Sequence, residues 1–532
     1  MPKLLVLVVA LAFASIGRST AAQDIQTAQA VASRDAAGVT VRYTLPEPVT
    51  RVAFSDHDTI RTLWAVTTPG LTLDDDVISS ERPFDAFELH LRPDAAEVDR
   101  VYMGLSLAGE GRVVFGPGFM LEGIRTELSF ALTMGETSLP DAHLIDGYAY
   151  VGPSTDIAID PRGDVVTGTN IAPELSEALR HSFFDSMAFY AARLNAGLPF
   201  RPVLIGSVDS PGPASFRGDV TETGVISVRF QGNAWRDAIE AVDPFVWHET
   251  FHLWNSHSVE TPDAEDAPWL HEGGAEYAAV VGAVSTGAMD EASARSSIAR
   301  RLNGCHRLLG ADDLDPVRLQ SGNGPYDCGV LIQWLVDLEA RKAGSGDVFM
   351  LWKTMLAAAR TSPTGYGVSE FRALTGTGSA VAVLLDGPSA TRWATIKARL
   401  ADLDVTIENH PGDQDLRGAA LMHVARINCP GGSYGFYDTP GELTLDGANC
   451  GVLSGEPIID TVEGHDPHRA SRPMFEAIQA RCADNLPIRY GTRDGRVLEA
   501  SCNQPLVEPE VWTIVDAPPL AIKDESRSTV TK

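Results

Sequence analysis

The nine residues 247–255, Trp-His-Glu-Thr-Phe-His-Leu-Trp-Asn, are the stretch that decides how this chain is interpreted. His248 and His252 are four positions apart, so on a helix they share one face, one turn apart, where two imidazoles can reach one metal ion. Glu249, next to the first histidine, is placed to take a proton from a water on that ion. This is the H-E-x-x-H arrangement of zinc hydrolases, so we expect a helix over about 242–256 that binds zinc.

A second motif, residues 269–277, reads Trp-Leu-His-Glu-Gly-Gly-Ala-Glu-Tyr and is expected to open the next helix. A catalytic zinc ion has three protein ligands and one open position for water. His271 and Glu272 are adjacent and point to different sides of a helix, so only one of them can be the third ligand. Glu276, one turn further on, either holds the second ring nitrogen of His248 or is a surface carboxylate.

Together the two motifs resemble those of the gluzincin metallopeptidases, and among these the glycyl aminopeptidase family. In that family the first motif continues His-x-Trp-Asn, as residues 252–255 do, and the second reads Trp-x-x-Glu-Gly, as residues 269–273 do. The resemblance covers about 240–360. It implies that Glu272 is the third ligand of one zinc ion per chain, and that the chain hydrolyses peptide bonds with a metal-activated water and Glu249 as general base.

The same resemblance implies a tyrosine that stabilises the oxyanion from the start of a downstream helix. The best match is Tyr326, at the start of the apolar segment 326–343, although a tyrosine there can also be a packing residue. Aminopeptidases of the family capture the free amine of the substrate with a glutamate in a glycine-rich edge strand. Residues 218–223 do not reproduce that motif, and Asp219 and Glu222 are the candidates to replace the glutamate. The exopeptidase or endopeptidase mode therefore stays open.

Residues 1–22 are predicted to be a signal peptide. Lys3 supplies the positive charge, 4–16 the apolar run and 20–22 the small-residue cleavage site. This run is too short to span a bilayer, and no later stretch reaches about 20 apolar residues. We therefore expect an exported protein of the periplasm or the extracellular space that does not span the membrane.

Six cysteines would then lie in an oxidising compartment. Sequence alone does not fix their connectivity. Their spacing favours pairs of neighbours: Cys305 with Cys328, Cys429 with Cys450, and Cys482 with Cys502. A cysteine metal cluster is the weaker hypothesis, because no two cysteines have C-x-x-C spacing.

The length of 532 residues predicts roughly two to four domains. The formal charge of −29 argues against nucleic acid or an anionic membrane as partner, since both attract basic surfaces. A peptide or protein substrate is the expected partner, and the oligomeric state is not indicated.

Changes of hydrophobic period suggest a multidomain α+β fold. Short alternating runs from about 37 to 160 predict an N-terminal β-sandwich domain, residues 23–160. Strands at 202–205 and 224–230 precede the zinc helix, as in thermolysin-like domains, where the edge strand binds the substrate backbone. We expect such a mainly helical catalytic domain at 161–405. Further helices are predicted at 290–303, 326–343 and 347–360.

After about 405 the pattern returns to strands. Glycine-rich segments at 432–436 and 450–455, followed by a strand at 458–464, resemble a degenerate PDZ domain over 406–518. Such a domain would bind a chain terminus by strand addition, or would only be a packing module. The polar tail 519–532 is expected to be disordered. The alternative to an enzyme is a catalytically inactive, peptidase-like protein that binds peptides or a protein partner through this domain.

Overall fold

The computed structural model describes residues 27–55, 61, 63–93, 105–140, 147–208, 215–231, 239–262, 267–309, 322–376, 389–431, 434–439 and 441–522. The predicted signal peptide at 1–22 lies outside the described residues, as does the end of the chain at 523–532. The chain divides into two compact units, 1–180 with 200–239, and 181–199 with 240–532. These units do not follow the predicted domain boundaries at 160 and 405, which stay predictions.

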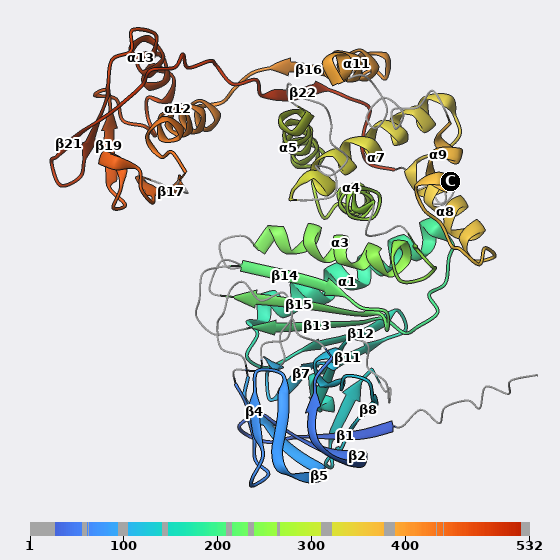
Figure 1. Cartoon of the computed structure of the whole chain (residues 1–532). Coiled ribbons are helices and arrows are strands. Elements are labelled where there is room, and N and C mark those ends of the chain that lie inside the picture. The colour runs from blue at the N-terminus through green and yellow to red at the C-terminus, as the bar shows by residue number, and fades with distance from the viewer. Residues whose placement is uncertain are drawn as a thin grey trace, which may run out of the picture. The chain divides into compact units, whose positions relative to one another are not determined.

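The first unit begins with two antiparallel-rich sheets that share one core (Figure 1). In the first sheet the order is β3-β5-β2-β1-β8, with β4 beside β5; in the second it is β6-β7-β10-β9. The bounds are β1 Thr27–Arg34, β2 Val39–Ala53, β3 Trp64–Val66, β4 Thr72–Asp74, β5 Val77–Leu91, β6 Leu105–Ala108, β7 Gly111–Phe115, β8 Arg125–Phe130, β9 Glu136–Leu139 and β10 Tyr148–Pro153. Buried and exposed positions alternate along β1 and β2, as a half-buried strand requires. The two sheets form the β-sandwich that the alternation predicted.

A third sheet of the same unit has the order β11-β12-β13-β15-β14. Its strands are β11 Ile157–Asp160, β12 Gly163–Thr167, β13 Val203–Val208, β14 Ser215–Val220 and β15 Val225–Gln231. β12, β13 and β15 are parallel, and β14 closes one edge in the antiparallel sense. The predicted strands at 202–205 and 224–230 are therefore neighbours in this sheet. The helix α1, Pro173–Leu194, packs its first half over β13, where Gly206 leaves room for Leu179.

The second unit is mainly helical. Its helices up to residue 402 are α3 Val242–Asn255, α4 Pro268–Thr286, α5 Glu291–Leu309, α7 Gly324–Ala343, α8 Val348–Ala359, α9 Val368–Thr375 and α11 Ser389–Asp402. The five helices predicted from about 242 to 360 are thus present as α3, α4, α5, α7 and α8, with shifted ends. α4 begins with Pro268 in its first turn and ends before Gly287, whose φ of 85° is the left-handed conformation that favours glycine. Gly273 and Gly329 let α4 and α7 approach closely, because a Cβ on Gly273 would lie 2.3 Å from the Gly329 Cα.

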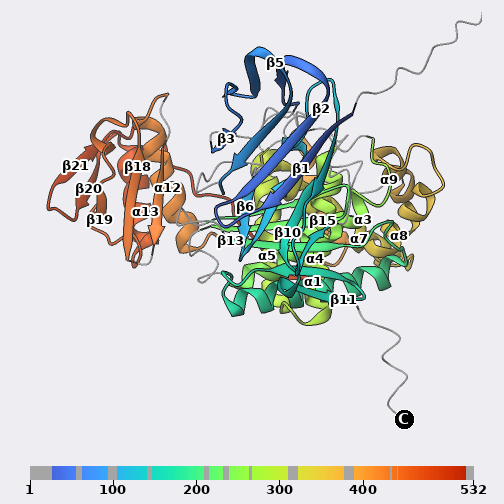
Figure 2. The same ribbon diagram turned by 90° about the horizontal axis from the view of Figure 1, so that it is seen from below.

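The segment after 405 was predicted as strands, but two helices frame it. α12 Asp413–Asn428 and α13 Ser471–Ala483 lie beside a five-stranded antiparallel sheet (Figure 2). Its strands follow one another in chain order: β17 Tyr434–Thr439, β18 Glu442–Gly447, β19 Ile458–Val462, β20 Ile488–Thr492 and β21 Val497–Ala500. β16, Thr406–Asn409, pairs with β22, Trp512–Asp516. We call residues 410–511 between these two strands the C-terminal module, and its first and last residues therefore lie next to the same two-stranded sheet. The PDZ likeness of the module stays a prediction.

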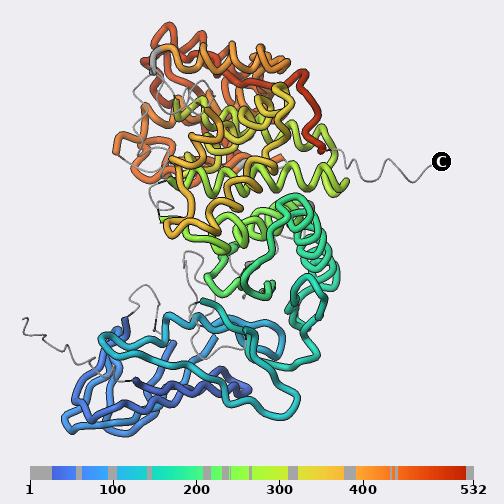
Figure 3. The backbone as a smooth tube through the Cα atoms, turned by 90° about the vertical axis from the view of Figure 1, so that its right-hand side faces the viewer, coloured from blue at the N-terminus to red at the C-terminus, as the bar shows by residue number. Residues whose placement is uncertain are grey.

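The predicted disulfides Cys305–Cys328, Cys429–Cys450 and Cys482–Cys502 are all present. The prediction of a disordered tail from 519 is wrong for its first residues. Arg341 Nη1 donates to the carbonyl of Pro519 at 2.7 Å, and Leu520 is buried. The last described stretch of backbone, in dark red, precedes the grey end of the chain (Figure 3). None of the described helices combines the length and the apolar character that a membrane crossing requires.

Candidate metal centre

Buried aromatic side chains on the opposite side of α3 determine which face of this helix is left for metal binding. Trp247, Phe251 and Trp254 recur at intervals of four and three residues and are almost fully buried. Trp254 Nε1 donates to the Ala196 carbonyl at 2.8 Å, and Tyr190 Oη donates to the Trp247 carbonyl at 3.2 Å. These aromatic anchors set the rotation of the helix about its axis. One residue further on, the polar stripe of His248, His252 and Asn255 therefore faces α4.

Three ligand atoms meet between α3 and α4. His248 Nε2 lies 3.1 Å from His252 Nε2 and 3.1 Å from Glu272 Oε2, and the His252 and Glu272 atoms are 3.5 Å apart. Tetrahedral zinc with N and O ligands at its usual bond lengths separates neighbouring ligand atoms by about 3.3 Å. The triangle therefore fits zinc, with the fourth position left for water.

Glu276 lies behind the first histidine. Its Oε2 is 3.2 Å from His248 Nδ1, while His248 Nε2 faces the other two ligand atoms. Burial alone would lower the pKa of His248, but the carboxylates of Glu272 and Glu276 raise it to about 10. Burial would raise the pKa of Glu276, yet His248 and the charge of Arg301 bring it down to about 2. Glu276 is thus an ionised carboxylate that orients the imidazole of His248.

Asn255 performs the same task for the second histidine, and sequence reasoning assigned it no role. Its Oδ1 is 3.0 Å from His252 Nδ1, and its Nδ2 donates to the His271 carbonyl at 2.9 Å. The ring of His271 is turned toward the Asn255 carbonyl, 3.0 Å from Nδ1. The structure therefore brings Glu272, and not His271, to the two histidines. The available signal was the position of Asn255, three residues after His252 on the same helical face.

Glu249 and Tyr326 flank this triangle. Glu249 follows His248 on α3 and is only 8% exposed, and burial raises its pKa despite the nearby histidines. The Tyr326 ring lies 5.9 Å from the His248 ring, centroid to centroid. Burial, and then the charge of Glu272 together with a hydrogen bond to it, raise the pKa of Tyr326, so the phenol stays a proton donor at neutral pH. A proton acceptor and a hydrogen-bond donor thus accompany the three ligand atoms.

Asp219 and Glu222, the predicted amine-binding residues, are not among these ligand atoms. Asp219 is on β14 and Glu222 in the turn that follows, both in the first compact unit, so their part in amine binding stays a prediction. His257 follows α3 and is not part of the ligand group. Among the described residues, one more group of donor atoms converges, His423 with Cys482 and Cys502, but its two sulfurs form a disulfide.

Comparison with known proteins adds evidence on the fold. No protein-family model and no curated protein matches the chain. The chain is similar to the crystal structure of an aminopeptidase N family protein from Idiomarina loihiensis, with a TM-score of 0.55 and 13% identity, over 92% of this chain and 98% of that chain. Yeast LTA4 hydrolase in complex with bestatin also matches, with a TM-score of 0.35 and 10% identity, over 75% of this chain and 71% of that chain. The first of these likenesses shows that the chain shares the fold of that aminopeptidase N family protein along nearly its whole length. The closer resemblance to glycyl aminopeptidases stays a prediction.

Proposed function

We propose that this protein is an exported zinc-dependent metallopeptidase with one zinc ion per chain. The observation that carries the proposal is the triangle of His248 Nε2, His252 Nε2 and Glu272 Oε2, with the buried carboxylate of Glu249 next to it. The aminopeptidase-like fold and the three disulfides support peptidase chemistry and export, respectively.

His248, His252 and Glu272 would hold the zinc ion, which would lower the pKa of a bound water and polarise the scissile carbonyl. In our proposal Glu249 accepts the proton of the attacking water and passes it to the departing amine. The hydroxyl of Tyr326 donates a hydrogen bond to the oxygen that becomes negative as the carbonyl is attacked. Glu276 and Asn255 hold the two imidazoles so that each keeps one ring nitrogen directed at the metal.

The finer assignment is an aminopeptidase similar to the glycyl aminopeptidases. It requires an acidic group that binds the free amine of the substrate, and we propose Asp219 or Glu222 for this role. An endopeptidase needs no such group. Replacing each residue by its amide therefore separates the two modes. In an aminopeptidase the change at the amine-binding residue lowers activity on substrates with a free amine, whereas an endopeptidase keeps its activity on blocked peptides.

The experiment that tests the proposed function combines zinc analysis with a panel of amino-acid and blocked-peptide reporter substrates. Wild type should contain one zinc ion per chain and cleave reporters. Glu249→Gln should retain zinc and lose about 100- to 10,000-fold in kcat, which is the usual effect of removing a general base. Glu174→Gln, at an exposed position of α1, is the matched control and should behave like wild type.

The alternative, an inactive protein that binds peptides or a partner through the C-terminal module, makes a different prediction. In such a protein no reporter is cleaved, and Glu249→Gln changes neither turnover nor peptide binding. That result with zinc-loaded wild type would exclude the peptidase.

A further inference from the structure

α5 supplies no ligand to the proposed zinc site, yet one of its side chains reaches the residues behind that site. Arg301 Nη2 and Nε lie 2.6 Å and 3.2 Å from Glu276 Oε1, and Arg301 Nη1 lies 3.1 Å from Asp327 Oδ1. Glu276 belongs to α4 and Asp327 to α7. A single guanidinium therefore joins three helices through two carboxylates.

Each of these carboxylates leads directly to a residue of the site. The second oxygen of Glu276, Oε2, holds His248 Nδ1 at 3.2 Å. Asp327 is the neighbour of Tyr326 in the first turn of α7, and the Arg301 Cζ lies 5.7 Å from the centroid of the Tyr326 ring. Arg301 thus lies behind the imidazole of a ligand and behind the proposed oxyanion donor at once.

The packing of α5 against α7 is fitted to this arrangement. A Cβ on Gly304 would lie 2.0 Å from Asp327 Oδ2, so a larger residue here would displace that carboxylate from its place beside α5. The next residue, Cys305, forms a disulfide with Cys328, directly after Asp327. The first turn of α7 is therefore held to α5 by a covalent bond, by close contact and by the Arg301 ion pair.

We infer that Arg301 is a positioning residue of the zinc site: it fixes Glu276, and through it the His248 ring, and it fixes the start of α7, and with it Tyr326. The inference rests on the proposed function. Arginine suits the task because its planar fork offers several N–H donors in fixed directions, whereas a lysine ammonium is a point charge. A residue that orients a metal-bound histidine typically changes metal affinity by about 10- to 100-fold when it is removed.

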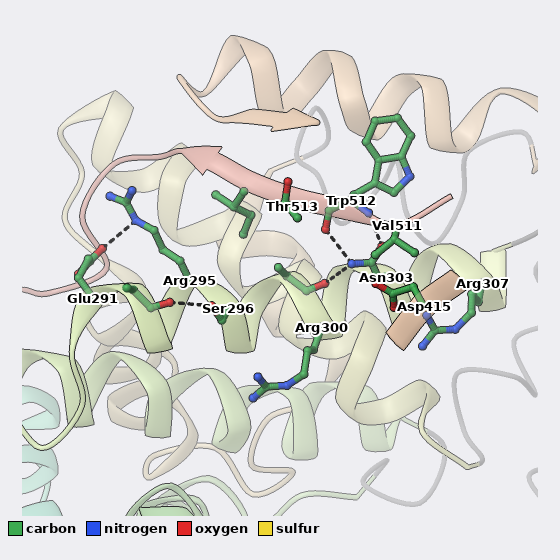
Figure 4. A pocket seen from close by; sticks show the side chains of 13 residues that line it. Glu291, Arg295, Ser296, Arg300, Asn303, Arg307, Asp415, Val511, Trp512 and Thr513 are labelled. Atoms are coloured by element: carbon green, nitrogen blue, oxygen red, sulfur yellow. Dashed lines mark hydrogen bonds and ion pairs between the residues drawn. The ribbon is translucent and has the colours of Figure 1, made fainter. Parts of the chain in front are cut away.

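A purely structural ion pair would give a different result, and the chain offers a matched control. Arg300 is adjacent on the same helix, but its side chain is exposed and lines a cavity of 850 Å³ between α5 and β22 (Figure 4). Arg301→Lys and Arg300→Lys therefore change the same chemistry on two faces of α5.

The test uses the full chain, stripped of metal, and measures the dissociation constant of zinc by competition with a chromogenic chelator, without substrate. Arg301→Lys should weaken zinc binding about tenfold or more, and Arg300→Lys should leave it within about twofold of wild type. If both variants bind zinc like wild type, or if Arg301→Lys only lowers the unfolding temperature, Arg301 is structural and the inference is overturned.

A second pair of variants tests the two carboxylates that Arg301 binds, one at a time. Neither single variant depends on whether Arg301→Lys folds. Asp327→Asn keeps the shape beside Gly304 but weakens the pair with Arg301, so kcat should fall while zinc affinity and KM stay near wild type. Glu276→Gln should weaken zinc binding, and Arg301→Lys added to Glu276→Gln should weaken it no further. Zinc affinities that fall independently in the double variant contradict a route through Glu276.

Failure of the proposed function can be distinguished from failure of the Arg301 inference, because zinc binding is measured without substrate. If wild type binds zinc but cleaves no reporter, the peptidase proposal fails, and the zinc measurements still decide the role of Arg301. If wild type cleaves reporters and the Arg301 variants bind zinc normally, only the inference about Arg301 fails. If wild type binds no zinc, both are overturned.

Discussion

Among the described residues of the second unit, two places bring three potential metal ligands together, and they differ in chemistry. His248, His252 and Glu272 place two imidazole nitrogens and a carboxylate oxygen in one triangle. His423, Cys482 and Cys502 are similarly close, but the sulfurs form a disulfide, and His423 Nε2 lies 3.0 Å from the Gln504 carbonyl oxygen. Zinc is bound by cysteine as the thiolate, and a disulfide supplies none. His423 Nε2 donates its N–H to the Gln504 carbonyl, so this nitrogen has no lone pair for a metal. Proximity of donor atoms is therefore not sufficient for a metal site.

The two groups of donor atoms also differ in the residues that surround them. Behind the first group lie three connected, partly buried charges, Glu276, Arg301 and Asp327, which we propose orient the ligands. Behind the second lies an apolar core that includes the paired sulfurs of Cys429 and Cys450. Changes at the first place should therefore affect zinc binding and turnover, and changes at the second should affect the stability of the C-terminal module.

The largest difference between the two places is expected for single histidine replacements. His252→Ala removes one of three protein ligands of zinc and should weaken zinc binding about 300- to 8,000-fold, if a zinc binding free energy of about 10–16 kcal/mol is shared equally among them. His423→Ala should leave zinc affinity unchanged. Zinc titration with a competing chelator checks both variants. A zinc stoichiometry that falls in His423→Ala would show that the second group binds metal and would break the comparison.

Removing the disulfide of the second group should change the stability of the module without changing zinc binding. Cys482→Ser with Cys502→Ser opens a link between residues 20 apart, which should cost about 3 kcal/mol of unfolding free energy for the module. Zinc affinity should remain that of wild type. Denaturant unfolding followed beside zinc titration provides the two measurements. The matched change, Cys305→Ser with Cys328→Ser, should lower stability and also kcat, because this disulfide adjoins Tyr326 and Asp327 in α7.

Much of the site could be predicted because its signals are local. The spacing of His248 and His252 specifies one helical face, and Pro268 marks the start of the next helix. The choice between His271 and Glu272 was not determined by the residues themselves. It depends on the direction of each side chain, and the structure turns His271 toward the Asn255 carbonyl.

Other features could not be predicted, for two different reasons. Arg301 is one of several arginines on α5, and only the packing of α5 against α4 and α7 distinguishes it from Arg300. The helix α12, by contrast, carried a readable signal: Leu416, Ala420 and Val424 are buried at intervals of four residues. This period is typical of a helix that packs on one face, whereas the segments that follow it alternate like strands. Order at 519–522 depends on backbone carbonyls that accept hydrogen bonds from Arg341, which composition does not show.

For a change of one pH unit, the smallest of these effects is a shift in zinc affinity that only the first histidine group should show. In the metal-free protein, Glu272 and Glu276 raise the pKa of His248 to about 10, so its ring is protonated at neutral pH. Zinc requires the neutral ring, and binding must therefore release this proton. Below the raised pKa, each unit of pH increase should strengthen apparent zinc affinity by about tenfold from this proton alone.

Zinc dissociation constants measured from pH 6 to 9 check this slope. Glu276→Gln removes one of the two carboxylates that hold the proton on His248, so its affinity should stop rising at a lower pH than that of wild type. His423→Ala changes a residue of the C-terminal module, so its zinc affinity should depend on pH as that of wild type does. A wild-type affinity that does not change between pH 7 and 9 would mean that His248 is already neutral. The paired carboxylates would then not control this ligand, and the electrostatic difference between the two histidine groups would disappear.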